Sequence, residues 1–235
     1  KEGSHGLVPC GTTGESPTLT HEEHERVIDL CIETADGKVP VIAGTGSNST
    51  DEAISLTNYS KRAGASAALI VTPYYNKPTQ EGLYKHFKSI NDSCNIPIII
   101  YNIPGRSVVD IDIETMQRLA KLKNIIGVKD SSNDLTRPLL TTKNIGKNFC
   151  QISGEDATVV PFLSQGGHGC ISVTANIAPK LCSELHNAWQ KGNIKKVKYI
   201  NSFLFPLHNV LFLETSPGPV KYAASLLKIC SEELR

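Results

Sequence analysis

Short apolar segments alternate with longer amphipathic segments along the whole chain. The apolar segments are rich in valine and isoleucine and are continuously apolar, which is typical of strands that are buried on both faces of a parallel sheet. The pattern predicts seven strands, over residues 6–11, 39–44, 67–72, 96–101, 125–130, 149–154 and 169–173.

The amphipathic segments between the strands predict helices. Thr20 precedes one of them with the spacing of a capping box, and Gly64 and Gly192 stand where helices often end. The helical pattern covers residues 21–34, 50–63, 80–93, 112–121, 135–145, 157–165 and 179–191, and two more helices follow at 194–212 and 217–227.

Regular alternation of strands and helices indicates a parallel α/β sheet, either open and doubly wound or closed into a (β/α)₈ TIM barrel. Polar side chains end nearly every strand, and a barrel brings all these ends to one face, whereas an open sheet uses mainly those near its switch point. We therefore expect a TIM barrel. Residues 1–193 would hold strands 2 to 8, its first βα unit would be absent before Lys1, and 194–235 would be a truncated C-terminal helical extension.

Composition narrows the class of function. The chain has 235 residues and a net charge of +1, without the basic face of a nucleic-acid reader. No apolar stretch approaches the roughly 18 residues of a membrane span. Seven cysteines lie scattered with no metal-binding spacing, which indicates reduced thiols and a cytoplasmic location.

Lys129 is the first candidate for chemistry, because it stands in the apolar run 125–130. Burial favours the neutral amine, which is a nucleophile for carbonyl carbons. The alternative is that the strand ends at Val128 and Lys129 faces solvent. Tyr101 ends the preceding strand, where its phenol would serve as a proton shuttle or would only cap the core.

Two loops and two histidines complete the candidates. The loop 11–15 has two glycines and two threonines suited to a carboxylate, and Arg106 has the fork geometry for another, although each could be an ordinary surface loop. His21 and His24 are three residues apart, but no further ligands complete a metal motif, so no metal is expected.

Together these residues resemble the dihydrodipicolinate synthase family, within the pyruvate-dependent class I aldolases that also include N-acetylneuraminate lyase. The resemblance spans essentially the whole chain. It rests on five motifs in order: Gly11-Thr-Thr-Gly-Glu15, Val71-Thr-Pro-Tyr-Tyr-Asn76, Tyr101-Asn-Ile-Pro-Gly-Arg106, Gly127-Val-Lys-Asp130 and Gly167-His-Gly-Cys-Ile-Ser-Val173.

The resemblance implies a lyase of lysine (diaminopimelate) biosynthesis that condenses pyruvate with aspartate 4-semialdehyde to give 4-hydroxy-tetrahydrodipicolinate. It uses no cofactor beyond the covalent Schiff base on Lys129. Tyr101 matches the proton-shuttling tyrosine, with Thr12 and Tyr75 as its relay partners, and the Tyr75 equivalent comes across a tight dimer interface.

The substrate-binding set follows from the same resemblance. Thr13, Gly14 and the backbone near Ile171 match contacts to pyruvate, Gly154 lines the pocket, and Arg106 matches the arginine that guides the semialdehyde carboxylate. The family further implies a homotetramer, built as a dimer of tight dimers.

Lysine feedback is a further implication of the resemblance. The positions that contact the allosteric effector L-lysine at the dimer interface are matched by Ser16, His21, His24, Asn48, Glu52 and Tyr74. An ordinary surface helix with histidine and glutamate would give the same pattern.

Two other functions are compatible with this sequence. One is a sister aldolase, such as N-acetylneuraminate lyase or a keto-deoxy-sugar-acid aldolase. The other is a non-catalytic binding protein that keeps the fold, although a pure binder has no need of the Lys129, Tyr101 and Thr12 set.

Overall fold

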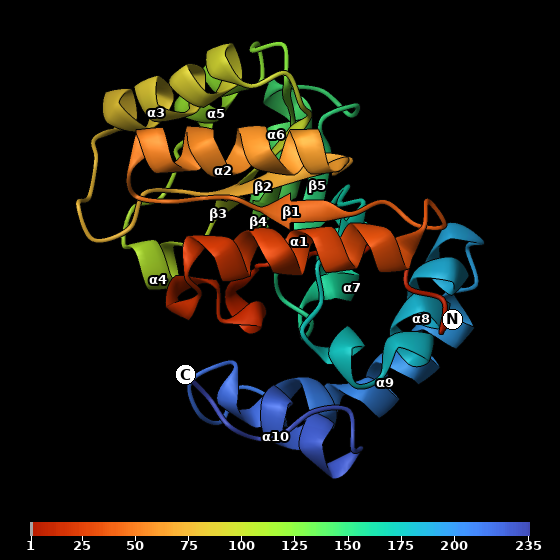
Figure 1. Cartoon of the computed structure of the whole chain (residues 1–235). Coiled ribbons are helices and arrows are strands. Elements are labelled where there is room, and N and C mark those ends of the chain that lie inside the picture. The colour runs from red at the N-terminus through yellow and green to blue at the C-terminus, as the bar shows by residue number, and fades with distance from the viewer. Residues whose placement is uncertain (1) are drawn as a thin grey trace.

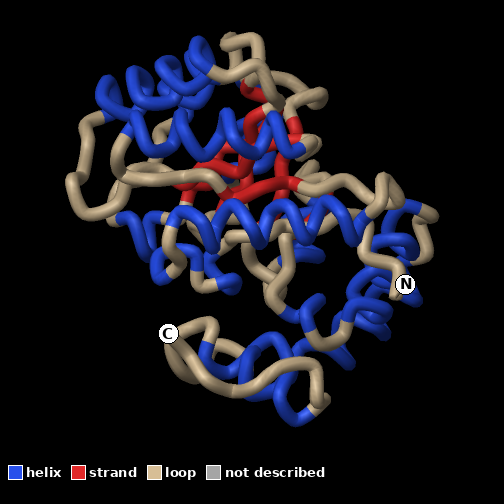
Figure 2. Tube along the Cα trace, in the orientation of Figure 1, coloured by secondary structure: helices blue, strands red, loops and turns tan. Residues whose placement is uncertain are grey.

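The chain forms one curved sheet of six parallel strands with helices against its outer face, in a computed structural model that describes residues 2–235 (Figure 1). The strands follow one another in chain order across the sheet, so every connection is a crossover. Figure 2 shows the strands among the helices that surround them. This confirms the predicted α/β class, and the fold is TIM-barrel-like. The strands are β1 (Ile42–Gly44), β2 (Ala67–Val71), β3 (Ile98–Asn102), β4 (Ile125–Asp130), β5 (Cys150–Ser153) and β6 (Gly169–Cys170).

The first predicted strand is wrong, because its segment pairs with the sheet only at one bridge, between Leu7 and Val41. The Leu7 carbonyl accepts the Ile42 N–H at 2.8 Å, as in a parallel ladder. Two residues later the Pro9 carbonyl still accepts the Gly44 N–H at 2.9 Å, but Pro9 has no N–H to donate in return, and Cys10 has a left-handed φ of 55°. The ladder therefore stops, and residues 2–235 hold six strands rather than seven.

The predicted helices are all present, with ends that move by a few residues. Thr20 caps the first one, because its hydroxyl accepts the Glu23 N–H at 3.2 Å and the Glu23 carboxylate accepts the Thr20 N–H at 2.9 Å. Gly64 and Gly192 have φ of 101° and 67°, the left-handed backbone that ends a helix. The helices are α1 (His21–Ala35), α2 (Thr50–Ala63), α3 (Gln80–Ser93), α4 (Pro104–Ser107), α5 (Ile113–Leu119), α6 (Arg137–Asn144), α7 (Val159–Ser164), α8 (Pro179–Gln190), α9 (Ile194–Val210) and α10 (Gly218–Leu226), with short 3-10 turns η1 (Thr12–Gly14), η2 (Ser16–Thr18) and η3 (Thr174–Asn176).

Strand alternation divides the sheet into two faces. Ile70 of β2 and Ile98 and Ile100 of β3 pack outward in the main core, with Leu83 and Phe87 of α3. The next residues along the strands point the other way, where a smaller cluster includes Leu69, Ile99 and Tyr101. The inner face of the sheet therefore carries the side chains that can reach a ligand.

The last three helices lie beyond the sheet, at the end of the chain (Figure 1). Leu185 of α8 packs with Ile200 and Leu204 of α9 in a separate core. The N-terminal segment runs along α8, where His5 Nε2 lies 3.1 Å from Asn187 Oδ1. Within residues 2–235, no helix is both long and apolar enough to span a membrane.

Candidate active site

Lys129 and Tyr101 face each other on neighbouring strands. The two residues are register partners in the pairing of β3 with β4, as expected from the sequence. Lys129 Nζ lies 3.8 Å from the centroid of the Tyr101 ring. Both residues are buried, with 8% and 7% of their surface exposed. Lys129 therefore does not face solvent at a strand end, and Tyr101 contacts the amine rather than only capping the core.

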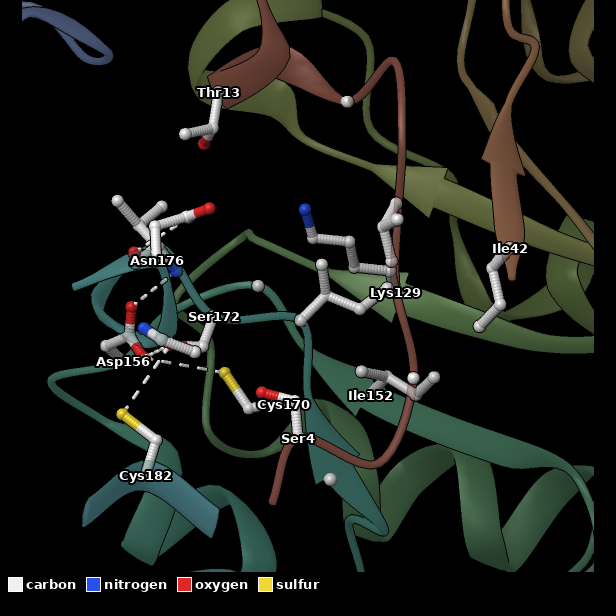
Figure 3. Close-up of a pocket in the computed structure, with 18 of the residues that line it drawn as sticks. Ser4, Thr13, Ile42, Lys129, Ile152, Asp156, Cys170, Ser172, Asn176 and Cys182 are labelled. Atoms are coloured by element: carbon white, nitrogen blue, oxygen red, sulfur yellow. Dashed lines mark hydrogen bonds between the residues drawn. The ribbon is translucent and has the colours of Figure 1, made fainter. Parts of the chain in front are cut away.

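The lysine side chain extends into a cavity of about 1090 Å³ on the inner face of the sheet (Figure 3). Ile42, Leu69 and Ile152 form part of its apolar wall, and α8 contributes Cys182. A cavity of this size takes a small organic substrate. An amine in such a place can attack a carbonyl carbon while bulk water is partly excluded.

Gly154 leaves room for the lysine. It follows β5, and a Cβ built on it would lie 2.9 Å from Lys129 Cε and closer still to Ser131 Oγ. Glu155 comes next and lines the same cavity. Burial raises the pKa of the Glu155 carboxyl, while the charge of Lys129 acts in the opposite direction.

The threonine loop approaches the cavity from the N-terminal part of the chain. Thr12, Thr13 and Gly14 form η1, and all three line the cavity. The side chain of Thr13 points toward the space in front of Lys129 (Figure 3). The turn is thus placed to offer hydroxyl groups to a substrate carboxylate, as the sequence suggested.

Arg106 lies in α4 at the exposed rim of the same cavity. Its Nη2 donates a hydrogen bond to the carbonyl oxygen of Ser216 at 3.1 Å. The guanidinium is therefore already fixed at one nitrogen, and its other donors remain for an anion at the cavity mouth.

The loop after β6 is organised by a buried carboxylate that the sequence analysis missed. Asp156 accepts hydrogen bonds from the Val173 N–H at 2.8 Å, the Thr174 N–H at 3.0 Å and the Ser172 hydroxyl at 2.5 Å (Figure 3). This ends β6 before residue 173 and presents Ile171 to the cavity. The sequence did offer a signal for this residue, because Asp156 comes two residues after Gly154, the last residue of a predicted strand.

Tyr75 does not contribute to the cavity of its own chain. It has a left-handed φ of 72° and is 89% exposed. Tyr74 beside it is also exposed, and its carbonyl oxygen accepts a hydrogen bond from Asn48 Nδ2 at 3.2 Å. The structure thus separates Tyr75 from Lys129, Tyr101 and Thr12 within one chain.

The residues matched to an effector site form a second group near the start of α1 and α2. His21 Nε2 lies 3.2 Å from Glu52 Oε1, and Glu52 also accepts a hydrogen bond from the Ser47 hydroxyl. His24 is buried one turn along, where burial lowers its pKa and its Nδ1 has no partner among the described residues. Ser16 begins η2, just before α1.

Not every polar side chain at a strand end faces the cavity. Thr45 is fully buried after β1, and its hydroxyl lies 2.9 Å from that of Thr57 on α2. Among residues 2–235, no three histidine, cysteine, aspartate or glutamate side chains are grouped so that they could hold a metal ion.

The sequence is similar to curated proteins of one kind. A sequence model described as the Dihydrodipicolinate synthetase family matches residues 1–235. The 4-hydroxy-tetrahydrodipicolinate synthase of Rhodospirillum centenum is 66% identical over 234 residues, which are 100% of this chain and 80% of that protein. The protein of the same name from Parvibaculum lavamentivorans is 59% identical over 235 residues, covering 100% of this chain and 81% of that protein.

Solved structures are similar over the same length. Dihydrodipicolinate synthase from Aquifex aeolicus matches with a TM-score of 0.97 and 46% identity, covering 100% of this chain and 80% of that one. The chloride-inhibited enzyme from Acinetobacter baumannii, complexed with pyruvate, gives 0.97 and 45%, with 100% and 80% covered. The enzyme from Cyanidioschyzon merolae with lysine bound gives 0.93 and 36%, with 97% and 78% covered.

Proposed function

The chain belongs to the dihydrodipicolinate synthetase family, and from this premise we propose that it is a 4-hydroxy-tetrahydrodipicolinate synthase. The lyase condenses pyruvate with L-aspartate 4-semialdehyde in lysine (diaminopimelate) biosynthesis. One observation carries the proposal: the buried amine of Lys129 lies 3.8 Å from the centroid of the Tyr101 ring inside a cavity that is large enough for a small substrate.

Lys129 begins the reaction as the nucleophile. Its amine adds to the keto carbon of pyruvate, water leaves, and the imine makes the methyl group acidic. Loss of a methyl proton gives an enamine, whose carbon attacks the aldehyde. The amino group of the second substrate then attacks the imine carbon, which closes the ring and releases the Lys129 amine. No metal or other cofactor takes part.

Tyr101 moves protons in these steps. Its phenol gives a proton to oxygen as water leaves and to the aldehyde oxygen as the new bond forms. Thr12 relays protons to it from η1, a turn that lines the same cavity. Tyr75 completes the relay from a second copy of the chain, a role that is compatible with its 89% exposure.

The substrate carboxylates bind at two places. Thr13, Gly14 and the backbone at Ile171 hold the carboxylate of pyruvate, and Gly154 keeps the path to Lys129 open. Arg106 binds the carboxylate of the semialdehyde at the rim. The relative from Acinetobacter baumannii was solved as a complex with pyruvate, which supports pyruvate as a substrate of this chain.

A direct assay tests this function against the alternatives. Purified protein is incubated with pyruvate and aspartate 4-semialdehyde, or with N-acetylneuraminate, and products are identified by mass spectrometry. We expect 4-hydroxy-tetrahydrodipicolinate from the first pair and no product with Lys129→Ala. Turnover of N-acetylneuraminate alone would indicate a sister aldolase. A folded wild-type protein that converts neither would indicate a binding protein.

L-lysine is the effector in this proposal, bound by the group around Glu52. A carboxylate with a histidine beside it can hold an ammonium group, and a relative has been solved with lysine bound. Ser16, His24, Asn48 and Tyr74 complete the site. Lysine should raise the melting temperature of the wild type and not that of Glu52→Gln.

The proposal extends to the assembly and to the location of the protein. A homotetramer of tight dimers would place Tyr75 in the neighbouring cavity, and sedimentation of the full chain tests it. All seven cysteines are free thiols, which favours the cytoplasm. Within the chain we divide the barrel, residues 1–193, from a helical extension, residues 194–235.

A further inference from the structure

Two site residues have neighbours in the sequence that meet on the far side of the sheet. Asn102 follows Tyr101 on β3, and Asp130 follows Lys129 on β4. Strand alternation turns these two side chains away from the cavity, toward the helices. Both are buried. Polar groups in such a place need partners, because an unpaired buried carboxylate is costly.

Asn102 joins the two strands to the loop that carries Arg106. Its Nδ2 donates to Asp130 Oδ2 at 3.2 Å across the strand pair and to Asp110 Oδ1 at 2.7 Å. Its Oδ1 accepts the Ile111 N–H at 3.1 Å. These bonds close the base of the segment 103–110, in which Arg106 lies.

Arg137, in the first turn of α6, contacts Asp130, Asp110 and the backbone of Ile111. Its Nε lies 3.0 Å from Asp130 Oδ2. Its Nη1 donates to both oxygens of Asp110 at 3.0 and 3.1 Å, and its Nη2 donates to the Ile111 carbonyl at 2.6 Å. All three guanidinium nitrogens are therefore used, and the Arg137 side chain is only 20% exposed.

We propose that Arg137 is a positioning residue, which holds Tyr101, Lys129 and Arg106 in their mutual geometry through Asn102, Asp130 and Asp110. The inference rests on the proposed function, because it assigns a role in the same site. Arg137 touches no substrate. A lysine cannot replace it fully, because one ammonium group cannot span three partners that are arranged around a planar fork. Reactive groups displaced by a fraction of an ångström react more slowly.

The test is the rate at which pyruvate becomes trapped on Lys129 by borohydride, measured at saturating pyruvate. For Arg137→Gln we expect the rate constant to fall by about tenfold or more, while the trapped amplitude stays complete. Arg137→Lys should give an intermediate rate. A structural role alone would lower the amplitude, through misfolded protein, and would leave the rate constant of the folded fraction unchanged.

Arg118→Gln is the matched control. Arg118 also pairs with a carboxylate, Glu81 at 2.8 Å, and covers the ring of Tyr84, but it does so between α3 and α5, away from the cavity. Its rate constant should stay within about twofold of the wild type. A loss equal to that of Arg137→Gln, or no loss in either variant, would overturn the proposal.

Asp110→Asn keeps the test decisive if Arg137→Gln does not fold, because Asp110 is exposed and its replacement leaves Asp130 paired. The Michaelis constant for aspartate 4-semialdehyde should rise several-fold, since the Arg106 segment loosens, and that for pyruvate should change less. An equal change in both constants would contradict the inference. A wild-type protein that traps no pyruvate would instead overturn the proposed function itself.

Discussion

At the scale of single residues, the proposed chemistry depends on a lysine that is buried beside an aromatic ring. Within residues 2–235, Lys129 forms no salt bridge, and its Nζ lies over the face of Tyr101. A cation is attracted to that face, but the attraction is weaker than a buried ion pair. No carboxylate in this range therefore holds the amine in an ion pair, which leaves it free for the nucleophilic role proposed above.

Gly154→Ala should slow imine formation by about tenfold or more, equivalent to about 1.4 kcal/mol of barrier. The new Cβ would lie 2.9 Å from Lys129 Cε and nearer to Ser131, so both side chains must shift. The rate of borohydride trapping measures this effect. Gly105→Ala is the control, because a Cβ there meets nothing within 4 Å. Equal rates in both variants would show that Lys129 needs no such space.

The sequence predicted the residues that face the cavity better than those that support them. Tyr101 and Lys129 stand at the ends of apolar strands, so their partnership followed from strand order. Asn102 and Asp130 come one residue later, and alternation alone could have placed them behind the sheet. The position of Asp156 just after a predicted strand was visible, but its partners at Val173 and Thr174 lie beyond the next helix, and no local pattern pairs them.

At the scale of secondary-structure elements, the helices were predictable because their signals are local. The capping box at Thr20 and the glycine after α2 act within one turn of the chain. The apolar pattern overrode a local signal at the first strand, because Pro9 stands inside the segment and removes a ladder hydrogen bond. Strand pairing depends on both partners, whereas a helix end depends on one.

The contact between α2 and α3 should weaken in mild acid. Thr50 Oγ1 lies 2.9 Å from His86 Nδ1, and burial lowers the pKa of His86 to about 4. The unfolded chain binds a proton near pH 6.5, so stability is lost as the pH falls from about 6.5 toward 4. For His86→Gln we expect the fall in unfolding free energy between pH 7 and 5 to be smaller by about 1–2 kcal/mol.

Urea unfolding at the two pH values measures this difference. His5→Gln serves as the control, because His5 is exposed and should give the wild-type dependence on pH. If His86→Gln and the wild type lose the same free energy, His86 is not the group that senses acid.

At the scale of the whole molecule, the last helix, α10, contacts the loop that carries Thr12 and Thr13. Lys221 of α10 lies 2.6 Å from Glu15, the residue that follows η1. Its hydrogen bond lowers the pKa of the Glu15 carboxyl. The two residues are 206 positions apart, so no sequence pattern could have paired them. The positions of α8, α9 and α10 against the rest of the chain were likewise not predictable, because helical periodicity predicts a helix and not its packing partner.

Lys221→Gln should lower the melting temperature by about 2–4 °C, as expected for a loss of about 1 kcal/mol in a chain of this size. It should also raise the Michaelis constant for pyruvate, because Thr12 and Thr13 lie just before Glu15. Lys196→Gln is the control, since it breaks a more exposed pair with Glu184 at 2.9 Å within α8 and α9. An equal rise of the Michaelis constant for pyruvate in both variants would show that the contact of α10 with Glu15 does not support the site.

The most direct test of the account is to trap pyruvate on the protein with borohydride and to map the adduct by peptide mass spectrometry. Circular dichroism confirms that each sample is folded. We expect one reduced pyruvate adduct, on Lys129, and none in folded Lys129→Ala. An adduct on a different lysine, or a folded wild-type protein without any adduct, would contradict it.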